Sequence, residues 1–256
     1  MSAEFLRLER PGEGVARVVL DRPPLNVLHI PMLQELNQTL TELSAESELK
    51  LLVLTGAGKA FCAGVDVADH TAERVEFMIQ AFHGVVRQLL LLEVPVVAAV
   101  NGAALGGGCE LLLACDLAIA SEKAKLGQPE IRLGVVPPVA AVLMPRLIGR
   151  QRALDLVLTG RVIGAAEARE MGLVGRVVPV EAFDEAVTEY VRSLSSLSRP
   201  VLGLTKRTVV EGMGEPLWDA FERAENRYLH ELMELEDAHE GLAAFLEKRE
   251  PVWRDA

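Results

Sequence analysis

The chain has 256 residues, half of them hydrophobic, and a formal net charge of −11. This length and composition allow one large hydrophobic core with room for a small appended region. The acidic excess argues against nucleic acid as the main partner, and no apolar run is long enough to span a bilayer. We therefore expect a globular protein that binds neither nucleic acid nor a membrane.

The three cysteines, Cys62, Cys109 and Cys115, are sparse, odd in number and without a CxxC spacing. We expect reduced thiols that fill apolar space in a cytoplasmic protein. No cluster of histidine and cysteine has the spacing of metal ligands, so we expect no metal site. The N-terminal segment carries charges throughout, and no leader sequence is expected from it.

Hydrophobic periodicity predicts strands that alternate with helices, which is the pattern of an α/β fold. The predicted strands are residues 17–20, 49–54, 96–100, 117–120 and 176–180. The predicted helices are residues 31–43, 70–92, 109–114, 151–159, 181–198 and most of 200–256. A glycine-rich loop at 55–70, a small-residue loop at 138–141 and a short connection at 161–174 join them.

Three consecutive glycines, Gly106 to Gly108, stand between a predicted strand and a helix that begins CELLLA. A helix start directs several free backbone N–H groups and the positive end of a dipole toward one point. Glycines without side chains let a ligand approach these donors closely. Glu110 lies one turn into this helix, on the same face as the opening.

A second carboxylate, Glu130, follows twenty residues later in GQPEIRLG, where Pro129 keeps Gln128 out of a helix. Backbone donors beside two acids suit a reaction that builds negative charge on a carbonyl oxygen while protons move nearby. The alternative is structural: one acid complements a helix dipole and the other lies in a surface turn. Apolar neighbours of both acids, Leu111 and Ile131, favour the functional interpretation.

The segments NGAALGGGCEL, CDLAIA and LGQPEIRLG resemble motifs of the crotonase, or enoyl-CoA hydratase/isomerase, superfamily. The resemblance extends from about Val15 to Trp253. It implies a crotonase-like spiral of β-β-α turns in residues 1–198 and a helical C-terminal region, 199–256, that supports a homotrimer or homohexamer. It also implies an acyl-CoA thioester substrate and no separate cofactor, because coenzyme A enters as part of that substrate.

The resemblance also assigns site residues. The backbone N–H groups of Val65 and Gly107 would form an oxyanion hole, Glu110 would be the general base toward water and Glu130 the general acid. The other substrate- and CoA-binding positions that it implies are Pro24, Leu25, Ala63, Asp66, Val67, Gly106, Pro129 and Pro138. For the CoA phosphates the candidates are Lys206, or Lys248 and Arg249; a solvated helix face is the alternative for these three.

The segment after the second acid departs from the pattern LGxxPGxGGTQRL of straight-chain hydratases. Here it reads LGVVPPVAAVLMPRL, so Pro138 replaces a glycine. Proline has a fixed φ and no N–H, which predicts the loss of any donor there and a stiffer pocket wall. With the ending YLHELMELEDAHEGLAAFLEKR, this is most similar to the branch that hydrates cyclohexa-1,5-diene-1-carbonyl-CoA.

Three alternatives remain open. Two are enzymes of the same superfamily, a general straight-chain 2-enoyl-CoA hydratase and an enoyl-CoA isomerase. The third is a non-enzymatic crotonase-fold module that binds CoA or RNA. Since 37 acidic residues outnumber 26 basic ones and no helix is dense in lysine or arginine, the charge distribution argues against an RNA-binding module.

Overall fold

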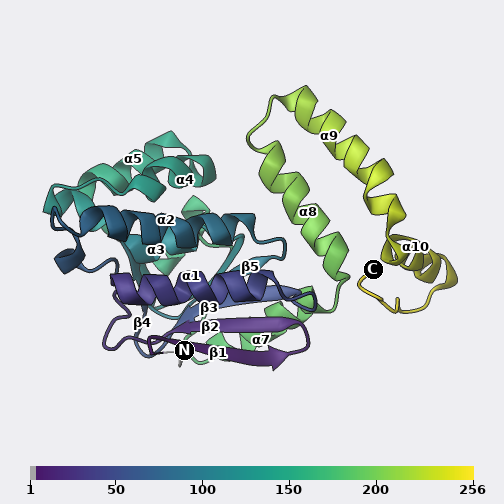
Figure 1. The fold of residues 1–256 in the computed structure, drawn as a ribbon, viewed down its shortest axis with the longest axis horizontal. Helices are drawn as coiled ribbons and strands as arrows, with labels where there is room; N and C mark the ends of the chain where they lie inside the picture. Colours follow the sequence, from purple (N-terminus) through teal and green to yellow (C-terminus); the bar gives the residue numbers. More distant parts are fainter. Residues whose placement is uncertain (1–3) are drawn as a thin grey trace.

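The computed structural model describes residues 4–256 and contains two β-sheets with helices packed around them (Figure 1). The larger sheet has six strands in the order β1-β2-β3-β5-β7-β10. Its first pair is antiparallel and its other neighbours are parallel. The strands are β1 (Leu6–Gly12), β2 (Val15–Leu20), β3 (Leu51–Gly56), β5 (Val96–Val100), β7 (Leu117–Ser121) and β10 (Arg176–Val178).

The smaller sheet has four three-residue strands in the order β4-β6-β8-β9. They are β4 (Ala60–Cys62), β6 (Ala103–Leu105), β8 (Lys125–Gly127) and β9 (Val162–Gly164). The first three run parallel to one another, whereas β9 is antiparallel to β8. The carboxyl ends of β4, β6 and β8 therefore meet at one edge of this sheet.

Ten α-helices and three short 3₁₀ helices account for most of the remaining described residues. The helices of the core are α1 (Ile30–Ser44), η1 (Val67–Asp69), α2 (Val75–Leu91), α3 (Gly107–Leu113), η2 (Pro129–Leu133), α4 (Pro138–Ile148), α5 (Arg150–Thr159), α6 (Ala165–Met171) and α7 (Phe183–Ser195). Those of the C-terminal region are α8 (Arg199–Gly212), α9 (Leu217–His230), η3 (Leu232–Glu234) and α10 (Glu236–Glu247).

The chain repeats one unit: a strand of the larger sheet, a strand of the smaller sheet and a helical segment. The first unit is β3, β4 and α2, the second is β5, β6 and α3, and the third is β7 and β8 followed by η2 and α4. This succession is the spiral of β-β-α turns that the resemblance implied. The predicted α/β fold is confirmed.

The strands β2, β3 and β5 in the larger sheet are buried on both faces. In β3, Leu52 and Leu54 belong to the main core, whereas Val53 packs with Phe183 and Val187 of α7 on the opposite face. Successive side chains of a strand point to opposite faces, so a parallel strand covered on both sides reads as a continuous apolar run. This burial explains why the apolar runs of the sequence predicted the central strands β2, β3 and β5.

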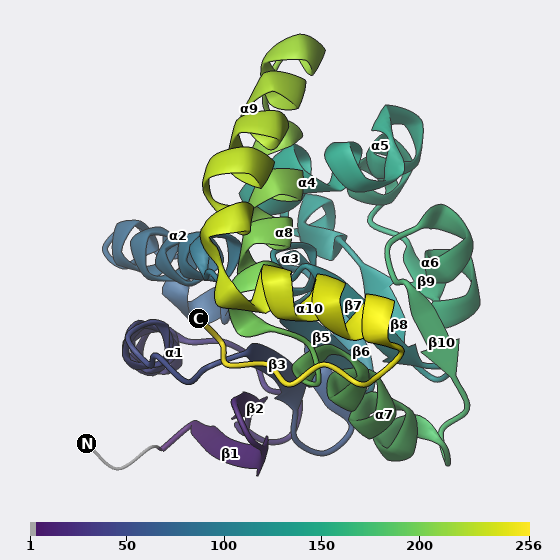
Figure 2. The ribbon, with the colours of Figure 1, turned by 90° about the vertical axis from the view of Figure 1, so that its right-hand side faces the viewer.

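The C-terminal helices α8, α9 and α10 form an arm that stands away from the spiral in Figure 1; in Figure 2 the arm faces the viewer, and α9 extends above the spiral. At its base, the Lys206 ammonium of α8 lies 2.7 Å from a carboxylate oxygen of Asp116 and donates to the Val94 carbonyl at 3.1 Å. The arm begins at Arg199. The division of the chain into two domains at this point stays a prediction.

Several sequence predictions of secondary structure were wrong in detail. Residues 138–141, predicted as a loop, form the first turn of α4, and the predicted connection at 161–174 contains β9 and α6. The helix predicted from residue 70 begins at Val75 instead. No helix within residues 4–256 is long and apolar enough to cross a membrane.

Candidate active site

Three segments leave the carboxyl ends of β4, β6 and β8. They carry Val65, Gly106 and Glu130, respectively. Gly106 follows β6 with φ 51° and ψ −127°, a conformation that favours glycine. A methyl group added at Gly106 would lie 2.7 Å from the Glu130 Oε1 atom. The structure therefore brings the glycine turn and the second acid, twenty-four residues apart in sequence, into direct contact.

The two predicted oxyanion donors lie next to each other. A methyl group added at Gly107 would lie 3.4 Å from the Val65 backbone nitrogen and 2.6 Å from its Cγ2 atom. Gly107 is the first residue of α3, so its N–H group has no acceptor within that helix. Within residues 4–256, neither N–H group donates a hydrogen bond. Two free donors at one place can stabilise a single oxyanion.

The chain fixes Val65 without using its N–H group. The Leu28 N–H donates to the Gly64 carbonyl at 2.8 Å, and the Asp66 N–H donates to the Leu28 carbonyl at 2.7 Å. These bonds flank Val65 in the pattern of a parallel bridge. The loop is held on both sides, and the donor between them stays available.

Glu110 is buried at the start of α3, with only 3% of its surface exposed. Its Oε1 atom accepts hydrogen bonds from the Val139 N–H at 2.9 Å and the Ala140 N–H at 2.8 Å. Burial raises the pKa of Glu110 to about 7, the nearby Glu130 charge adds to this rise, and the two N–H groups oppose it. Glu110 can therefore exchange a proton near neutral pH.

Glu130 lies in the 3₁₀ helix η2, one residue after its start, where the sequence had predicted a turn. Gln128 is fully buried, and the amide orientation that satisfies it donates to both Glu130 oxygens, at 3.0 and 3.1 Å. Burial raises the pKa of Glu130, and the charge of His70 opposes the rise. Among the described residues, no lysine or arginine forms a salt bridge with Glu110 or Glu130.

The structure adds three groups that sequence reasoning missed: the Gln128 amide and the N–H groups of Val139 and Ala140. The signal for Gln128 was its place beside Pro129 in the GQPE motif. No signal in the sequence revealed the donors of α4, because the small residues at 138–141 predict a loop and not the first turn of a helix. Pro138 stands at the start of α4, where the helix needs no N–H, so the helix offers Glu110 the next two donors instead.

The positions that the resemblance implied for CoA gather on one surface. The Ala63 N–H donates to the Leu25 carbonyl at 3.0 Å, which joins the turn containing Pro24 to the loop after β4. Asp66 pairs with Arg22 at 3.3 Å, and Val67 is exposed at the start of η1. Among the remaining predicted positions, Pro129 begins η2 and Pro138 begins α4.

Lys206 does not lie on a solvated helix face, so that alternative was wrong for this residue, and its predicted role at the CoA phosphates stays a prediction. Its side chain is 7% exposed and pairs with Asp116 at the base of the arm. The amphipathic pattern of α8 could not identify which acid would meet this lysine. Arg249 is engaged with Glu240 and Glu247 on the arm, and Lys248 ends α10 with φ 56°.

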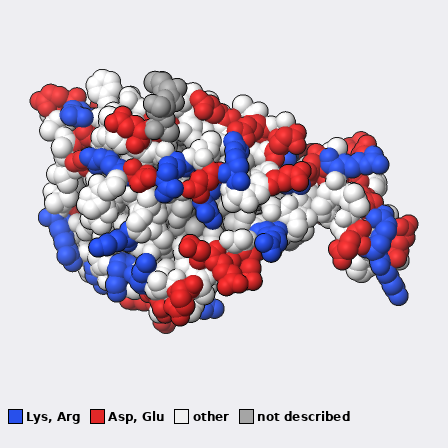
Figure 3. Space-filling view, turned by 90° about the horizontal axis from the view of Figure 1, so that it is seen from below, with Lys and Arg blue, Asp and Glu red and all other residues white. Residues whose placement is uncertain are grey.

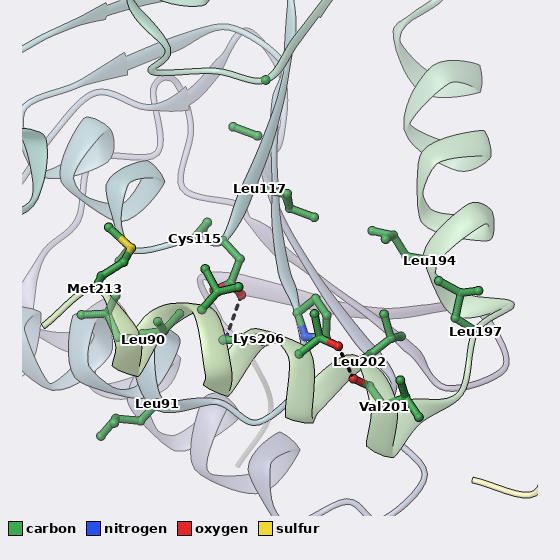
Figure 4. Close-up of a pocket in the computed structure, with 18 of the residues that line it drawn as sticks. Leu90, Leu91, Cys115, Leu117, Leu194, Leu197, Val201, Leu202, Lys206 and Met213 are labelled. Carbon is green, nitrogen blue, oxygen red and sulfur yellow. Dashed lines mark hydrogen bonds and ion pairs between the residues drawn. The ribbon is translucent and has the colours of Figure 1, made fainter. Parts of the chain in front are cut away.

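An apolar cavity of about 1180 Å³ lies between the core and the arm (Figure 4). Leucines of α2 and α7 face it from the core side, and Val201 and Leu202 line it from α8. Within the described residues it contains neither Glu110 nor Glu130 in its lining. This cavity and the acid pair are therefore separate features of the molecule.

A family model for enoyl-CoA hydratase/isomerase matches residues 10–256. The chain belongs to the enoyl-CoA hydratase/isomerase family. The predicted superfamily is thus confirmed, and with it, at the level of the family, an enzyme of the enoyl-CoA hydratase type.

Relatives of this family match over nearly their whole length. A probable enoyl-CoA hydratase of Rhizobium meliloti is 39% identical and covers 99% of both chains. A short-chain-enoyl-CoA hydratase of Clostridium acetobutylicum is 38% identical and covers 94% of both. The crystal structure of an enoyl-CoA hydratase from Bacillus anthracis matches with a TM-score of 0.95 at 36% identity, covering 99% of this chain and 100% of that one.

Proposed function

We propose that this member of the enoyl-CoA hydratase/isomerase family adds water to a conjugated enoyl-CoA thioester. One observation carries the proposal: the buried Glu110 and the partly buried Glu130, which form no salt bridge with a lysine or arginine within residues 4–256, lie beside two free backbone N–H groups. The N–H groups of Val65 and Gly107 suit a thioester oxygen that gains negative charge, and each donor of this kind is worth about 3 kcal/mol in a transition state. The raised pKa values of Glu110 and Glu130 suit proton transfer.

The proposed reaction has three proton and bond changes. Glu110 takes a proton from water as the oxygen bonds to the β-carbon, and the electrons of the double bond move toward the thioester oxygen. Val65 and Gly107 stabilise the resulting enolate. Glu130, which starts the cycle protonated, then gives its proton to the α-carbon. Transfer of the proton from Glu110 to Glu130 returns both acids to their starting states. The sum is one water added across one carbon–carbon double bond.

The first test follows loss of the conjugated chromophore of crotonyl-CoA, with mass spectrometry of the product. A hydratase gives a product heavier by one water. An isomerase gives a product of unchanged mass with the double bond moved, and this result would replace hydration by the isomerase alternative. If crotonyl-CoA is unchanged, the same assay is repeated with the cyclic dienoyl-CoA, and no hydration of either substrate would reject the hydratase proposal.

For the acyl group we propose a cyclic dienoyl thioester, cyclohexa-1,5-diene-1-carbonyl-CoA. The support is Pro138 at the start of α4, followed by the buried Val139 and Ala140. A stiff apolar wall suits a flat ring better than a flexible chain, because ordering a chain costs conformational entropy. Apolar pockets discriminate modestly, by about 1–3 kcal/mol for a methylene-sized change.

We expect kcat/KM for the cyclic dienoyl-CoA to exceed that for crotonyl-CoA by at least about 10-fold. Both substrates are measured on one preparation. A preference for crotonyl-CoA would keep the hydratase proposal and reject the ring. The short-chain hydratase among the relatives makes a straight-chain substrate the second candidate.

We propose a homotrimer or homohexamer in which the arm, residues 199–256, carries the contacts. Helix α9 exposes large apolar residues, and the apolar cavity lies beside the arm. These residues are Leu217, Trp218, Phe221, Tyr228 and Leu229. Light scattering coupled to size exclusion gives the mass, and a monomer at micromolar concentration would reject this assembly.

A cytoplasmic location and the absence of a nucleic-acid partner complete the proposal. The three cysteines are free thiols, which suits a reducing compartment. On the face seen in Figure 3, lysine and arginine alternate with aspartate and glutamate, and no continuous basic surface is visible there. Filter binding to RNA at moderate salt tests the non-enzymatic alternative, for which retention at micromolar protein would be the supporting result.

A further inference from the structure

The two oxygens of Glu110 have different surroundings. Oε1 accepts hydrogen bonds from the Val139 and Ala140 N–H groups, at 2.9 and 2.8 Å. Within residues 4–256, Oε2 accepts none. A carboxylate oxygen that already accepts two N–H bonds is a poor place for a proton, because the positive ends of both dipoles point at it.

We propose that the first turn of α4 is a positioning device that fixes Glu110 through Oε1 and leaves Oε2 as the atom that exchanges the proton. The inference rests on the hydratase function proposed above for its catalytic meaning. It extends that function by assigning the reactive atom and by naming Pro138, Val139 and Ala140 as positioning residues. None of the three needs to touch the substrate for this role.

The donors are available because of their place in α4. The first intrahelical bond runs from the Ala141 N–H to the Pro137 carbonyl, at 2.9 Å. The N–H groups of Val139 and Ala140 precede it and have no acceptor within the helix. A carboxylate at this end also interacts favourably with the helix dipole. Glu110 therefore completes the hydrogen bonding of α4, and α4 holds Glu110 in one orientation.

Pro138 sets where this helix begins. Its ring fixes φ near the helical value at a position where no N–H is required. A glycine at the same place would lower the order of the first turn, because glycine has more backbone freedom in the unfolded state and at the helix end. The proline thus holds the two following donors on Oε1. The same residue that stiffens the wall orients the acid.

The test measures the Glu110 titration directly, by ¹³C NMR on protein with labelled glutamate, with Glu110→Gln to assign the resonance. Val139→Pro removes one donor, and it also disfavours the helical conformation of Pro138 and removes a buried side chain. Pro138→Gly keeps both N–H donors but makes the first turn of α4, which holds them, less ordered. We expect the Glu110 midpoint to rise by roughly one pH unit in Val139→Pro and by less in Pro138→Gly, because N–H donation favours the ionised form.

The matched control is Pro31→Gly, which makes the same change in the first turn of α1, where no site acid accepts a bond. It should leave the Glu110 midpoint unchanged. In enoyl-CoA hydration, Pro138→Gly should lower kcat several-fold, and Pro31→Gly should change neither kcat nor KM. Circular dichroism confirms folding, and if Val139→Pro does not fold, Pro138→Gly carries the test.

The results separate this inference from the proposed function. An unmoved Glu110 midpoint in the folded α4 variants would overturn the inference, even where kcat falls, because α4 would then act only as a wall. A shifted midpoint in a protein that hydrates no enoyl-CoA would support the α4 contact and reject the hydratase proposal. A shifted midpoint with a lower kcat supports both.

Discussion

The acids at the site and the acids on the arm are in opposite electrostatic situations. Glu110 is buried beside Glu130 without a cation, and burial raises its pKa to about 7. Glu240, partly exposed on α10, accepts hydrogen bonds from both terminal nitrogens of Arg249, at 2.6 and 2.9 Å, and these hydrogen bonds lower its pKa to about 2. One acid exchanges its proton near neutral pH, and the other is ionised at every physiological pH.

The contrast shows where this fold tolerates an unfavourable charge. Surface acids with arginine partners are common and contribute little to stability. A buried acid without a cation lowers the stability of the native state, and such an arrangement marks a functional site more often than a structural one. The arm therefore offers matched controls for the site, since both contain acids and glycines of the same chemistry.

The largest expected effect is the loss of catalysis when either site acid loses its charge. Glu110→Gln and Glu130→Gln should each lower kcat for enoyl-CoA hydration by at least about 100-fold, the usual contribution of a general acid or base. Binding of a saturated acyl-CoA, measured by calorimetry, should persist. The control is Glu240→Gln, which should keep wild-type turnover. Near-normal turnover in either site variant would falsify the two-carboxylate mechanism.

The next effect concerns the oxyanion donors. Gly107→Ala places a methyl group 2.6 Å from the Val65 Cγ2 atom, so Val65 must move and its N–H group moves with it. We expect kcat to fall by about 10- to 100-fold, less than or equal to the usual loss of one oxyanion donor. Gly212→Ala on α8 meets only an ordinary contact, 3.7 Å from the Ala220 Cβ atom.

Turnover of the Gly212→Ala control should match the wild type, and thermal unfolding of both variants checks the fold. If Gly107→Ala folds and turns over normally, the oxyanion hole lies elsewhere. If Gly212→Ala loses activity to a similar extent, the arm takes part in the site, and the contrast between the two regions no longer holds.

The sequence was informative where chemistry restricts residue choice. Gly106 has a positive φ and lies beside the Glu130 carboxylate, so this position requires a glycine. The sequence shows this requirement as the GGG segment, and it shows the acid in the GQPE motif. Strand β5 is buried on both faces, and its sequence is therefore a continuous apolar run. The glycine turn, both acids and the α/β fold could therefore be predicted from residues and resemblance together.

The missing parts depend on geometry that short patterns do not encode. The three-residue strands β4, β6 and β8 are too short to show a period, yet their shared edge brings the loops together. Strand β1, LRLERPG at the edge of the larger sheet, has only a short apolar–charged alternation before Pro11 and Gly12, and this pattern was too short to predict a strand. The donors to Glu110 are main-chain groups, which no residue type reveals, and the partner of Lys206 lies ninety residues away.

The third prediction concerns stability. The Glu110 pKa rises on folding from 4.5 to about 7, so the native state binds this proton more tightly than the unfolded state. Wild-type stability should therefore fall as pH rises through about 7, and Glu110→Gln removes this loss. We expect the variant to be more stable than wild type by about 1–3 kcal/mol at pH 8.

Urea unfolding at pH 8 and pH 4.5 measures this difference. At pH 4.5 most of the advantage should vanish, because the wild-type acid is then protonated in the native state. A variant that is less stable than wild type at pH 8 would mean that the two N–H groups of α4 outweigh burial. In that case Glu110 is a structural anchor of α4 and not a strained acid.

The smallest expected effect is the reverse case on the arm. Folding lowers the Glu240 pKa, so its stabilising contribution is present above pH 4.5 and is lost as pH falls toward about 2. At pH 8, Glu240→Gln should lower stability slightly, opposite in sign to Glu110→Gln and smaller, because both members of the pair are solvated and screened. At 1 M salt, where the Debye length is about 3 Å, the difference from wild type should shrink further, while the Glu110→Gln difference should stay. Equal salt sensitivity of the two variants would mean that solvent reaches both acids alike, and the electrostatic contrast between site and arm would fail.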